Sequence, residues 1–100
     1  MAWCSLSSIT NPTSTSSYQV GATVLVTWNY SGGSGCDDWN VRKITLQSNY
    51  SGSWSNVSVL FNGYDAVTSG SRSVTLPSSV TNEGDYYRLK VEYEMEDLEP

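Results

Sequence analysis

Apolar and charged side chains alternate along residues 85–95, and this alternation constrains the fold more than any other feature of the chain. The first set is Tyr87, Leu89, Val91, Tyr93 and Met95, and the second is Tyr86, Arg88, Lys90, Glu92 and Glu94. Successive side chains of a β-strand point to opposite faces of its sheet. The segment is therefore predicted to be a strand with one buried face and one hydrated face.

Residues 22–30 follow the same rule, because Ala, Val, Val, Trp and Tyr occupy the even positions and Leu25 is the one apolar residue on the odd side. Trp28 is therefore expected in the core. Weaker patterns predict further strands at 39–47, 54–61 and 72–76, and a first strand in two halves, 3–9 and 18–20, broken at Asn11-Pro12. Their expected inward residues are Val41, Ile44 and Leu46, with a bulge near 42–43, then Val57, Val59 and Phe61, then Val74 and Leu76.

Turns rich in Gly, Ser and Asn separate these segments, and no stretch has helical periodicity beyond a single turn. About six to seven short strands of this kind predict an all-β sandwich. The turn at 82–87 resembles the corner of immunoglobulin-like domains, with Tyr86 or Tyr87 as the corner tyrosine. We therefore expect residues 1–100 to form a single immunoglobulin- or fibronectin-III-like sandwich around one core.

The last strand of such a sandwich is missing from the pattern, since only residues 97–100 follow the alternating segment and Glu96. Three explanations are open. The sequence stops short of that strand, the N-terminal strand covers the edge, or the edge is open to a partner strand. We expect the first.

The composition argues against several classes of function. The chain has no histidine, which removes histidine general-base catalysis and the commonest metal ligand, and two cysteines alone do not make a zinc site. The net charge is −5 and the five Lys and Arg are scattered among acids, so nucleic acid is not an expected partner. No segment approaches the roughly 20 apolar residues of a membrane span. We expect no enzymatic activity, no cofactor and no membrane contact by this domain.

The acidic residues offer two weak alternatives. A carboxylate pair could hydrolyse a glycosidic bond, but the acids fall in turn-like contexts or near the C-terminus, where carboxylates are usually solvated. Asp37 and Asp38 could help to hold calcium, but two adjacent acids fall far short of the roughly six oxygen ligands that the ion takes. We expect no catalytic residues and no metal site.

Two features predict an extracellular or cell-surface location. Cys4 and Cys36 are the only cysteines, and in an acidic chain rich in Ser, Thr and Asn an even count favours a disulfide over two free thiols. This disulfide would stabilise the fold by about 3–4 kcal/mol in the chain-entropy model. Asn-x-Ser sequons make Asn29, Asn49 and Asn56 candidate glycosylation sites.

The aromatic residues suggest how the domain could bind a ligand. Seven Tyr and four Trp stand against one Phe, a balance that suits half-exposed positions where sugar rings stack on aromatic faces. Trp39, Tyr50, Trp54 and Tyr64 lie at predicted strand starts or turns and are candidate carbohydrate-stacking residues. The alternative is that they cap the ends of the sandwich.

Three motifs carry a family resemblance. They are Ile9-Thr10-Asn11-Pro12, the segment 21–28 that ends in Thr-Trp, and Val74-Thr75-Leu76-Pro77 followed by the Gly-x-Tyr-Tyr strand of 84–91. Together they resemble the Ser/Thr-rich, GPI-anchored membrane family, whose domain also opens secreted fungal proteins needed for cell-wall β-1,6-glucan. The resemblance spans about residues 9–94 and brings no catalytic residues with it. It implies a surface module in a wall or envelope protein, in contact with glycan.

We therefore expect a non-catalytic surface module with a structural or adhesive role in a cell-wall or envelope protein. Cell-wall polysaccharide or another surface protein would be its partner. Two alternatives stay open. A carbohydrate-binding module of a secreted enzyme would lose its affinity when Trp39 or Trp54 is replaced, and a protein–protein module would use an open edge strand. The identity of the ligand and the oligomeric state do not follow from the sequence.

Overall fold

The computed structural model of the chain describes residues 4–13, 16, 18–78 and 87–95. Its strands are β1 (Ser5–Asn11), β2 (Thr23–Ser31), β3 (Trp39–Ser48), β4 (Ser55–Ala66), β5 (Ser71–Thr75) and β6 (Tyr87–Met95). Two short 3-10 helices, η1 (Gly33–Cys36) and η2 (Val67–Ser69), join them, and the described residues contain no α-helix. The predicted all-β class is confirmed.

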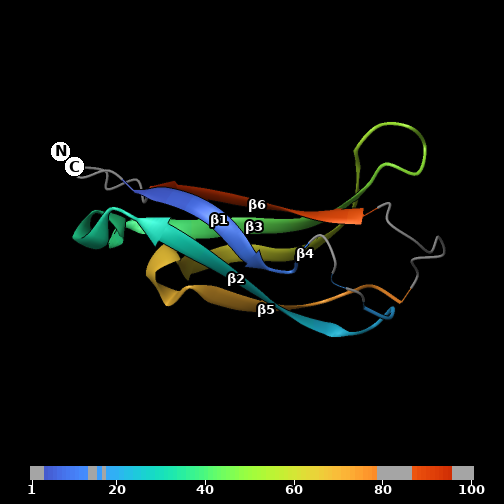
Figure 1. Ribbon diagram of the computed structural model, residues 1–100, viewed down its shortest axis with the longest axis horizontal. Helices are drawn as coiled ribbons and strands as arrows, with labels where there is room; N and C mark the ends of the chain where they lie inside the picture. The colour runs from blue at the N-terminus through green and yellow to red at the C-terminus, as the bar shows by residue number, and fades with distance from the viewer. Residues whose placement is uncertain (1–3, 14–15, 17, 79–86, 96–100) are drawn as a thin grey trace.

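The strands form two three-stranded antiparallel sheets, in the orders β1-β2-β5 and β4-β3-β6. The sheets face one another in a molecule with extents of 46 × 27 × 24 Å, and the strands run roughly along its long axis (Figure 1). β2 and β3 are the central strands of their sheets, so each is paired on both sides. This two-layer arrangement follows from strands that are apolar on one face only.

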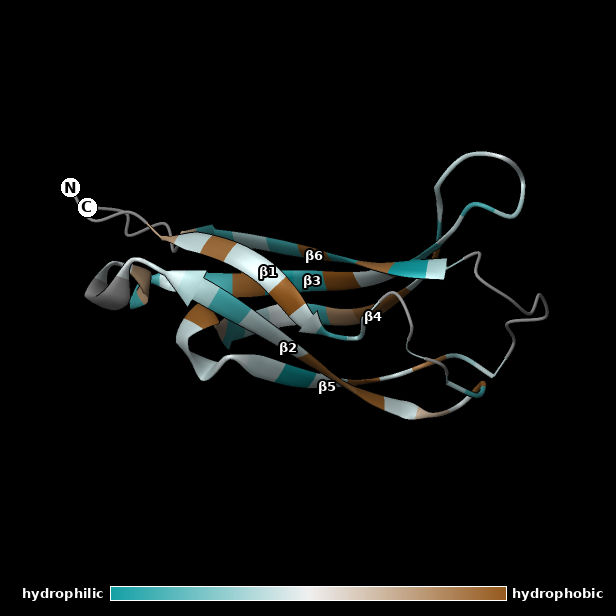
Figure 2. Ribbon diagram, in the orientation of Figure 1, coloured by the Kyte–Doolittle hydropathy of each residue, from teal (hydrophilic) through white to brown (hydrophobic). Residues whose placement is uncertain are grey.

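The core lies between the two sheets, and the central strands β2 and β3 carry hydrophobic residues at intervals along their length (Figure 2). Its buried side chains are Cys4, Val24, Val26, Trp28, Cys36, Val41, Ile44, Val67 and Val74. The alternation predicted for β2 holds through Trp28, whose indole Nε1 donates to the carbonyl of Val67 at 2.8 Å. It fails at Tyr30, which is exposed at the end of the strand. Leu25 is exposed, as predicted.

The predicted disulfide is present between Cys4 and Cys36. It joins the residue before β1 to the end of η1, across a sequence separation of 32. Both cysteines are fully buried in the core, so the bond closes one end of the space between the sheets as well as linking distant parts of the chain.

The sequence-based prediction of bounds and inward residues is wrong for β4. It continues to Ala66, through the Asn62-Gly63 step that reads as a turn. Val57 and Val59 are exposed rather than inward, while Leu60 and Phe61 pack against the core. The cause is the irregular pairing with β3, in which register shifts break the two-residue period. The bulge predicted near 42–43 is confirmed by the shift between Val41 and Lys43.

The N-terminal region also differs from the prediction, which gave a first strand in two halves. β1 is a single strand that ends at Asn11, before a cis Asn11–Pro12 bond, and Tyr18–Val20 is not a strand. β6 keeps the predicted alternation except at Met95, which is exposed at the end of the strand. Val74 is buried and Leu76 half-buried against the core, as predicted. The proposed corner at 82–86 and the first residue of the predicted strand half 3–9 lie outside the described residues.

Candidate functional site

The outer face of the β4-β3-β6 sheet carries a row of three polar side chains that bond to one another. Gln47 of the central strand lies opposite Asn56 of β4 and opposite Arg88 of β6. Its Nε2 donates to Asn56 Oδ1 at 2.9 Å, and its Oε1 accepts from Arg88 Nε at 2.8 Å. Gln47 is only 7% exposed despite its polar head. Both ends of its amide are therefore used, and the row is fixed across the sheet.

Trp54 stands at the end of this row, immediately before β4 begins at Ser55. The guanidinium carbon of Arg88 lies 4.1 Å from the Trp54 ring centroid, a cation–π arrangement. Trp54 remains 39% exposed. The indole is thus held on the surface by a guanidinium that Gln47 itself orients. A ring held in this way loses less conformational freedom when a ligand binds than a mobile one would.

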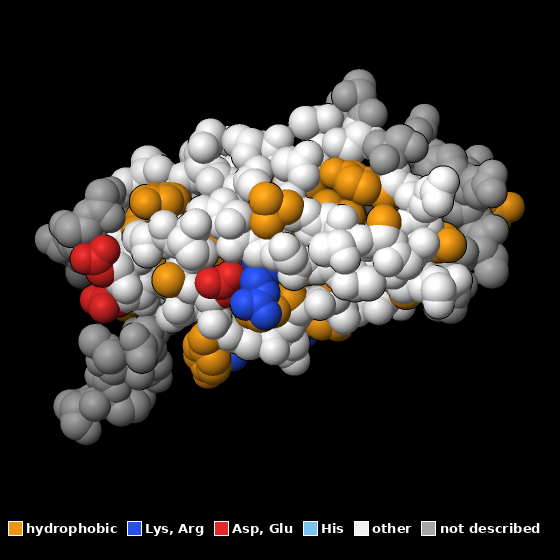
Figure 3. All heavy atoms as spheres, turned by 90° about the horizontal axis from the view of Figure 1, so that it is seen from below, with side chains coloured by type: hydrophobic (Ala, Val, Ile, Leu, Met, Phe, Trp, Pro, Cys, Tyr) orange, Lys and Arg blue, Asp and Glu red, His pale blue; other side chains and the backbone are white. Residues whose placement is uncertain are grey.

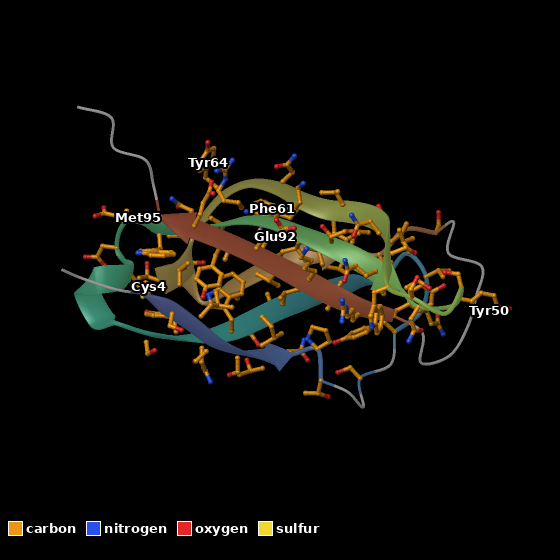
Figure 4. All side chains as sticks on the ribbon, turned by 90° about the horizontal axis from the view of Figure 1, so that it is seen from above. Cys4, Tyr50, Phe61, Tyr64, Glu92 and Met95 are labelled. Atoms are coloured by element: carbon orange, nitrogen blue, oxygen red, sulfur yellow. A yellow bond between two sulfur atoms is a disulfide. The ribbon has the colours of Figure 1, made fainter. Side chains whose placement is uncertain are left out.

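A second arginine–aromatic pair lies near the other end of the same face. Tyr64 of β4 is 70% exposed, and the guanidinium carbon of Arg42 lies 3.9 Å from its ring centroid. Arg42 Nε donates to the carbonyl of Gly63 at 2.8 Å, and Arg42 also forms an ion pair with Glu94 of β6. The bulge after Val41 allows this arginine to reach both neighbouring strands. Tyr64 projects away from the opposite sheet (Figure 4).

The charge on this sheet is more concentrated than the sequence suggests. Four of the five basic residues of the chain lie on β3 and β6: Arg42, Lys43, Arg88 and Lys90. Glu92 and Glu94 lie among them. Strand pairing brings these residues together although they are scattered along the chain. By contrast, the face seen in Figure 3 is mostly uncharged and polar, with apolar side chains in small separate groups.

The four aromatic residues predicted to stack on sugars fall into different places. Trp54 and Tyr64 share the β4-β3-β6 sheet, at opposite ends of β4. Tyr50 is exposed in the connection between β3 and β4, and Figure 4 shows it far from Tyr64. Trp39 is half-buried, packs against the core and lies 5.7 Å from Tyr93, ring centroid to ring centroid. The structure therefore groups two of the four on one outer face and turns Trp39 towards the interior.

The three sequon residues also differ in exposure. Asn29 is exposed on β2 and its Nδ2 donates to Ser8 Oγ at 3.4 Å. Asn56 is exposed and belongs to the row beside Trp54. Asn49 is half-buried, and its Oδ1 is buried with no hydrogen-bond partner in the described structure. Glycosylation at the three sites stays a prediction.

The acids weighed as a calcium site, Asp37 and Asp38, are exposed just after η1. Across the described part of the chain, no three acidic or thiol side chains gather closely enough to hold a metal ion.

Sequence reasoning missed Gln47 and Arg88 as members of a site. Each is ordinary in its own segment, because Gln47 lies in a weakly alternating stretch and Arg88 on the hydrated face of its strand. Their partnership depends on which residues of β3 and β6 lie opposite each other. The one signal available was that an arginine and an amide both occupied outward positions of predicted strands.

Comparison of the chain with models of protein families, with curated proteins and with solved structures returns no match. No helix in the described ranges is long and apolar enough to cross a membrane. The outer face of the β4-β3-β6 sheet is therefore the feature from which a function can be inferred.

Proposed function

We propose that this chain is a non-catalytic module of an extracellular or cell-surface protein that adheres to polysaccharide through the outer face of its β4-β3-β6 sheet. The observation that carries the proposal is the fixed array Asn56–Gln47–Arg88–Trp54. A sugar ring presents an apolar face of C–H groups beside hydroxyls. The exposed indole of Trp54 can stack on the apolar face, and the exposed groups of Arg88 and Asn56 that Gln47 does not use can bond to the hydroxyls.

The second arginine–aromatic pair supports an extended ligand rather than a single sugar. Trp54 and Tyr64 are separated by the whole of β4 up to position 64, about 30 Å of extended strand. Charged and amide side chains of β3 and β6 occupy the sheet between them, among them Lys43 and Lys90. A polymer lying along the strands could contact both rings, whereas a monosaccharide could contact only one.

The strand order supports an immunoglobulin-like assignment of the fold. In such sandwiches strands A, B and E form one sheet, while C and F, joined by C′ in some members, form the other. The orders β1-β2-β5 and β4-β3-β6 correspond to A-B-E and C′-C-F. We propose this correspondence, in which the edge of β6 that strand G covers in such sandwiches carries no strand among the described residues.

The proposed location rests on two features. The buried disulfide is typical of proteins that fold in oxidising compartments. The sequon at Asn29 lies on an exposed residue of the other sheet, away from the proposed binding face, and an oligosaccharide could occupy it. A location in a wall or envelope would also agree with the resemblance to the Ser/Thr-rich, GPI-anchored family.

A polysaccharide pull-down with the purified domain tests the proposal. β-glucans, chitin and an acidic polysaccharide serve as insoluble matrices, and Trp54→Ala is the decisive variant. We expect the unaltered domain to be retained by at least one matrix and Trp54→Ala to lose most of that retention. Tyr30→Ala is the matched control, because Tyr30 is an exposed aromatic residue on the other sheet.

Circular dichroism and thermal unfolding establish that each variant keeps its fold. Retention that survives Trp54→Ala but is lost in Tyr30→Ala would place the binding surface on the wrong sheet. Failure of every matrix to retain the domain would instead favour a structural or protein-binding role without glycan recognition.

A further inference from the structure

Within the described ranges, β6 is a long strand that has no strand paired along one of its edges. Among the described residues it pairs with β3 alone, along its full length from Tyr87 to Met95. The backbone groups on its other side have no strand partner in this part of the chain. Figure 4 shows β6 in front of its sheet, with β1 of the opposite sheet beside it. Such an edge is a template for pairing with another strand.

The outward side chains of β6 are charged, which is one of the ways in which proteins protect an edge strand, but its inward side chains give no such protection. Proteins commonly block an edge strand with a proline, with a bulge or with a charge that points inward. The inward positions of β6 are apolar or aromatic: Tyr87, Leu89, Val91 and Tyr93. These four are only half-buried, although they face the core side of the sheet. A strand added at this edge would extend the apolar layer over them.

The outward side chains of β6 show an ordered distribution of charge. Arg88 and Lys90 occupy the first half of the strand, and Glu92 and Glu94 occupy the second. A strand with a basic first half and an acidic second half is complementary to itself when the second copy runs in the opposite direction. In a parallel pairing in register, like charges would lie opposite one another, which destabilises a sheet.

We propose that β6 pairs with β6 of a second copy of this chain, antiparallel and with Val91 opposite Val91. In that register Arg88 lies opposite Glu94 and Lys90 opposite Glu92, each pair occurring twice by symmetry. The inward pairs are all apolar or aromatic: Val91 with Val91, Leu89 with Tyr93, and Tyr87 with Met95. The exposure of Met95, 57% in the single chain, would fall on pairing.

The neighbouring registers are less favourable. Moving the symmetry centre to Lys90 places that residue opposite its own copy, and moving it to Glu92 places two carboxylates opposite each other. Only the register centred on Val91 matches every outward charge with an opposite one. Ion pairs within one chain, Lys90 with Glu92 at 3.8 Å and Arg42 with Glu94, involve the same groups and would become part of a shared network.

The dimer would join two sheets into one of six strands, in the order β4-β3-β6-β6-β3-β4. A two-fold axis perpendicular to this sheet leaves both outer faces on the same side. Two Trp54 sites would then be presented to one polymer, which raises avidity without any new contact. The pairing itself does not depend on sugar binding, and its test requires no glycan.

Sedimentation equilibrium over micromolar to millimolar protein concentrations, at low salt, tests the pairing. A single strand pair is a small interface, so we expect a weak dimer. The weight-average mass should rise from 11.0 kDa towards twice that value as concentration increases. The variants Lys90→Glu and Glu92→Lys each place like charges opposite each other twice, and we expect each to remain monomeric.

Two matched samples make the charge argument specific. An equimolar mixture of the Lys90→Glu and Glu92→Lys chains restores opposite charges in every pair, so the mixture should dimerise although neither component does. The double variant Lys90→Glu/Glu92→Lys restores the same complementarity within one chain at unchanged net charge, and should dimerise again. Both positions are about half exposed, at 54% and 47% for the two side chains, so the fold should tolerate the changes.

Three results would overturn the proposal. The first is a protein that stays monomeric at all concentrations. The second is a dimer that the two single variants leave unchanged, because another surface or register would then be responsible. The third is a mixture of the single variants that stays monomeric while the unaltered chain associates. Amide chemical-shift changes on dilution give an independent readout, and they should be concentrated in 87–95 rather than in β4 or β5.

Discussion

The guanidinium of Arg88 stacks on the ring of Trp54 while its Nε donates to the amide of Gln47, so one side chain links an exposed aromatic residue to the centre of its sheet. The same arginine would face Glu94 of a second copy in the proposed dimer. Replacing Arg88 would therefore affect sugar retention and self-association together. For this reason sugar retention is tested with a substitution at Trp54, and self-association is tested with substitutions at Lys90 and Glu92.

Gln47 is expected to stabilise the outer face through both ends of its amide. Replacing it with alanine leaves Asn56 Oδ1 without its donor and Arg88 Nε without its acceptor. We expect Gln47→Ala to lower the free energy of unfolding by about 1–3 kcal/mol, measured by urea denaturation. Gln47→Glu is the matched control. Its carboxylate still accepts from Arg88 and can accept from the Asn56 amide after that group rotates, so the loss should be much smaller.

The same substitution should weaken sugar retention if Arg88 depends on Gln47 for its position. In the pull-down, Gln47→Ala should then reduce retention less than Trp54→Ala but more than Tyr30→Ala. Retention unchanged by Gln47→Ala, in a variant shown to be folded, would mean that Trp54 needs no support from this row.

Trp28 is expected to fix the connection between β4 and β5 to the core. Its Nε1 donates to the carbonyl of Val67 at 2.8 Å, and its backbone N–H donates to the carbonyl of Gly70 at 3.0 Å. Trp28→Phe removes the first of these bonds and part of the buried ring, which should cost about 1–3 kcal/mol of stability. Tyr30→Phe, on the same strand, removes only an exposed and longer bond to the carbonyl of Thr68, at 3.5 Å, and should change stability by less than about 0.5 kcal/mol. Equal losses in the two variants, measured by thermal unfolding, would contradict this assignment.

The parts of the fold that could be predicted are those in which the two-residue period survives. β2 pairs with β5 without a register shift, and in the β3–β6 pair the extra residue lies on β3. The buried and exposed positions predicted from Val24 to Trp28 and from Tyr87 to Tyr93 are therefore the observed ones. β4 could not be read in this way. Its pairing with β3 shifts register more than once, and each shift moves the following side chains to the other face of the sheet. Val59 and Phe61 therefore point to different environments although they are two residues apart.

The candidate site was only half predictable for a related reason. Aromatic residues near predicted turns can be selected from one sequence. Trp54 and Tyr64 are candidates on that ground alone. Trp39 has a similar local sequence context, but its ring lies beside that of Tyr93, which is 54 positions later in the chain. This contact is made only in the tertiary fold and could not be predicted from local sequence. The contact of Gln47 with Arg88 spans 41 positions and depends on strand register, which short-range patterns do not encode.

The disulfide is expected to contribute more to stability than any single contact of the outer face. Cys4 and Cys36 are 32 residues apart. In the chain-entropy model, closing a loop of that length lowers the entropy of the unfolded chain and so stabilises the folded protein by about 3–4 kcal/mol. The double variant Cys4→Ala/Cys36→Ala should unfold at correspondingly lower urea concentration than the oxidised protein.

Both cysteines are buried, at 1% and 0% exposure, so a reductant should react with the native protein only as fast as the protein opens. Reduction by dithiothreitol, followed by acid quenching, removal of the reductant and alkylation of the free thiols, should therefore be slow in buffer and fast in urea. Rapid reduction in buffer with no loss of structure would show that this end of the core opens without unfolding the sandwich, and that the bond contributes little to holding β1 in place.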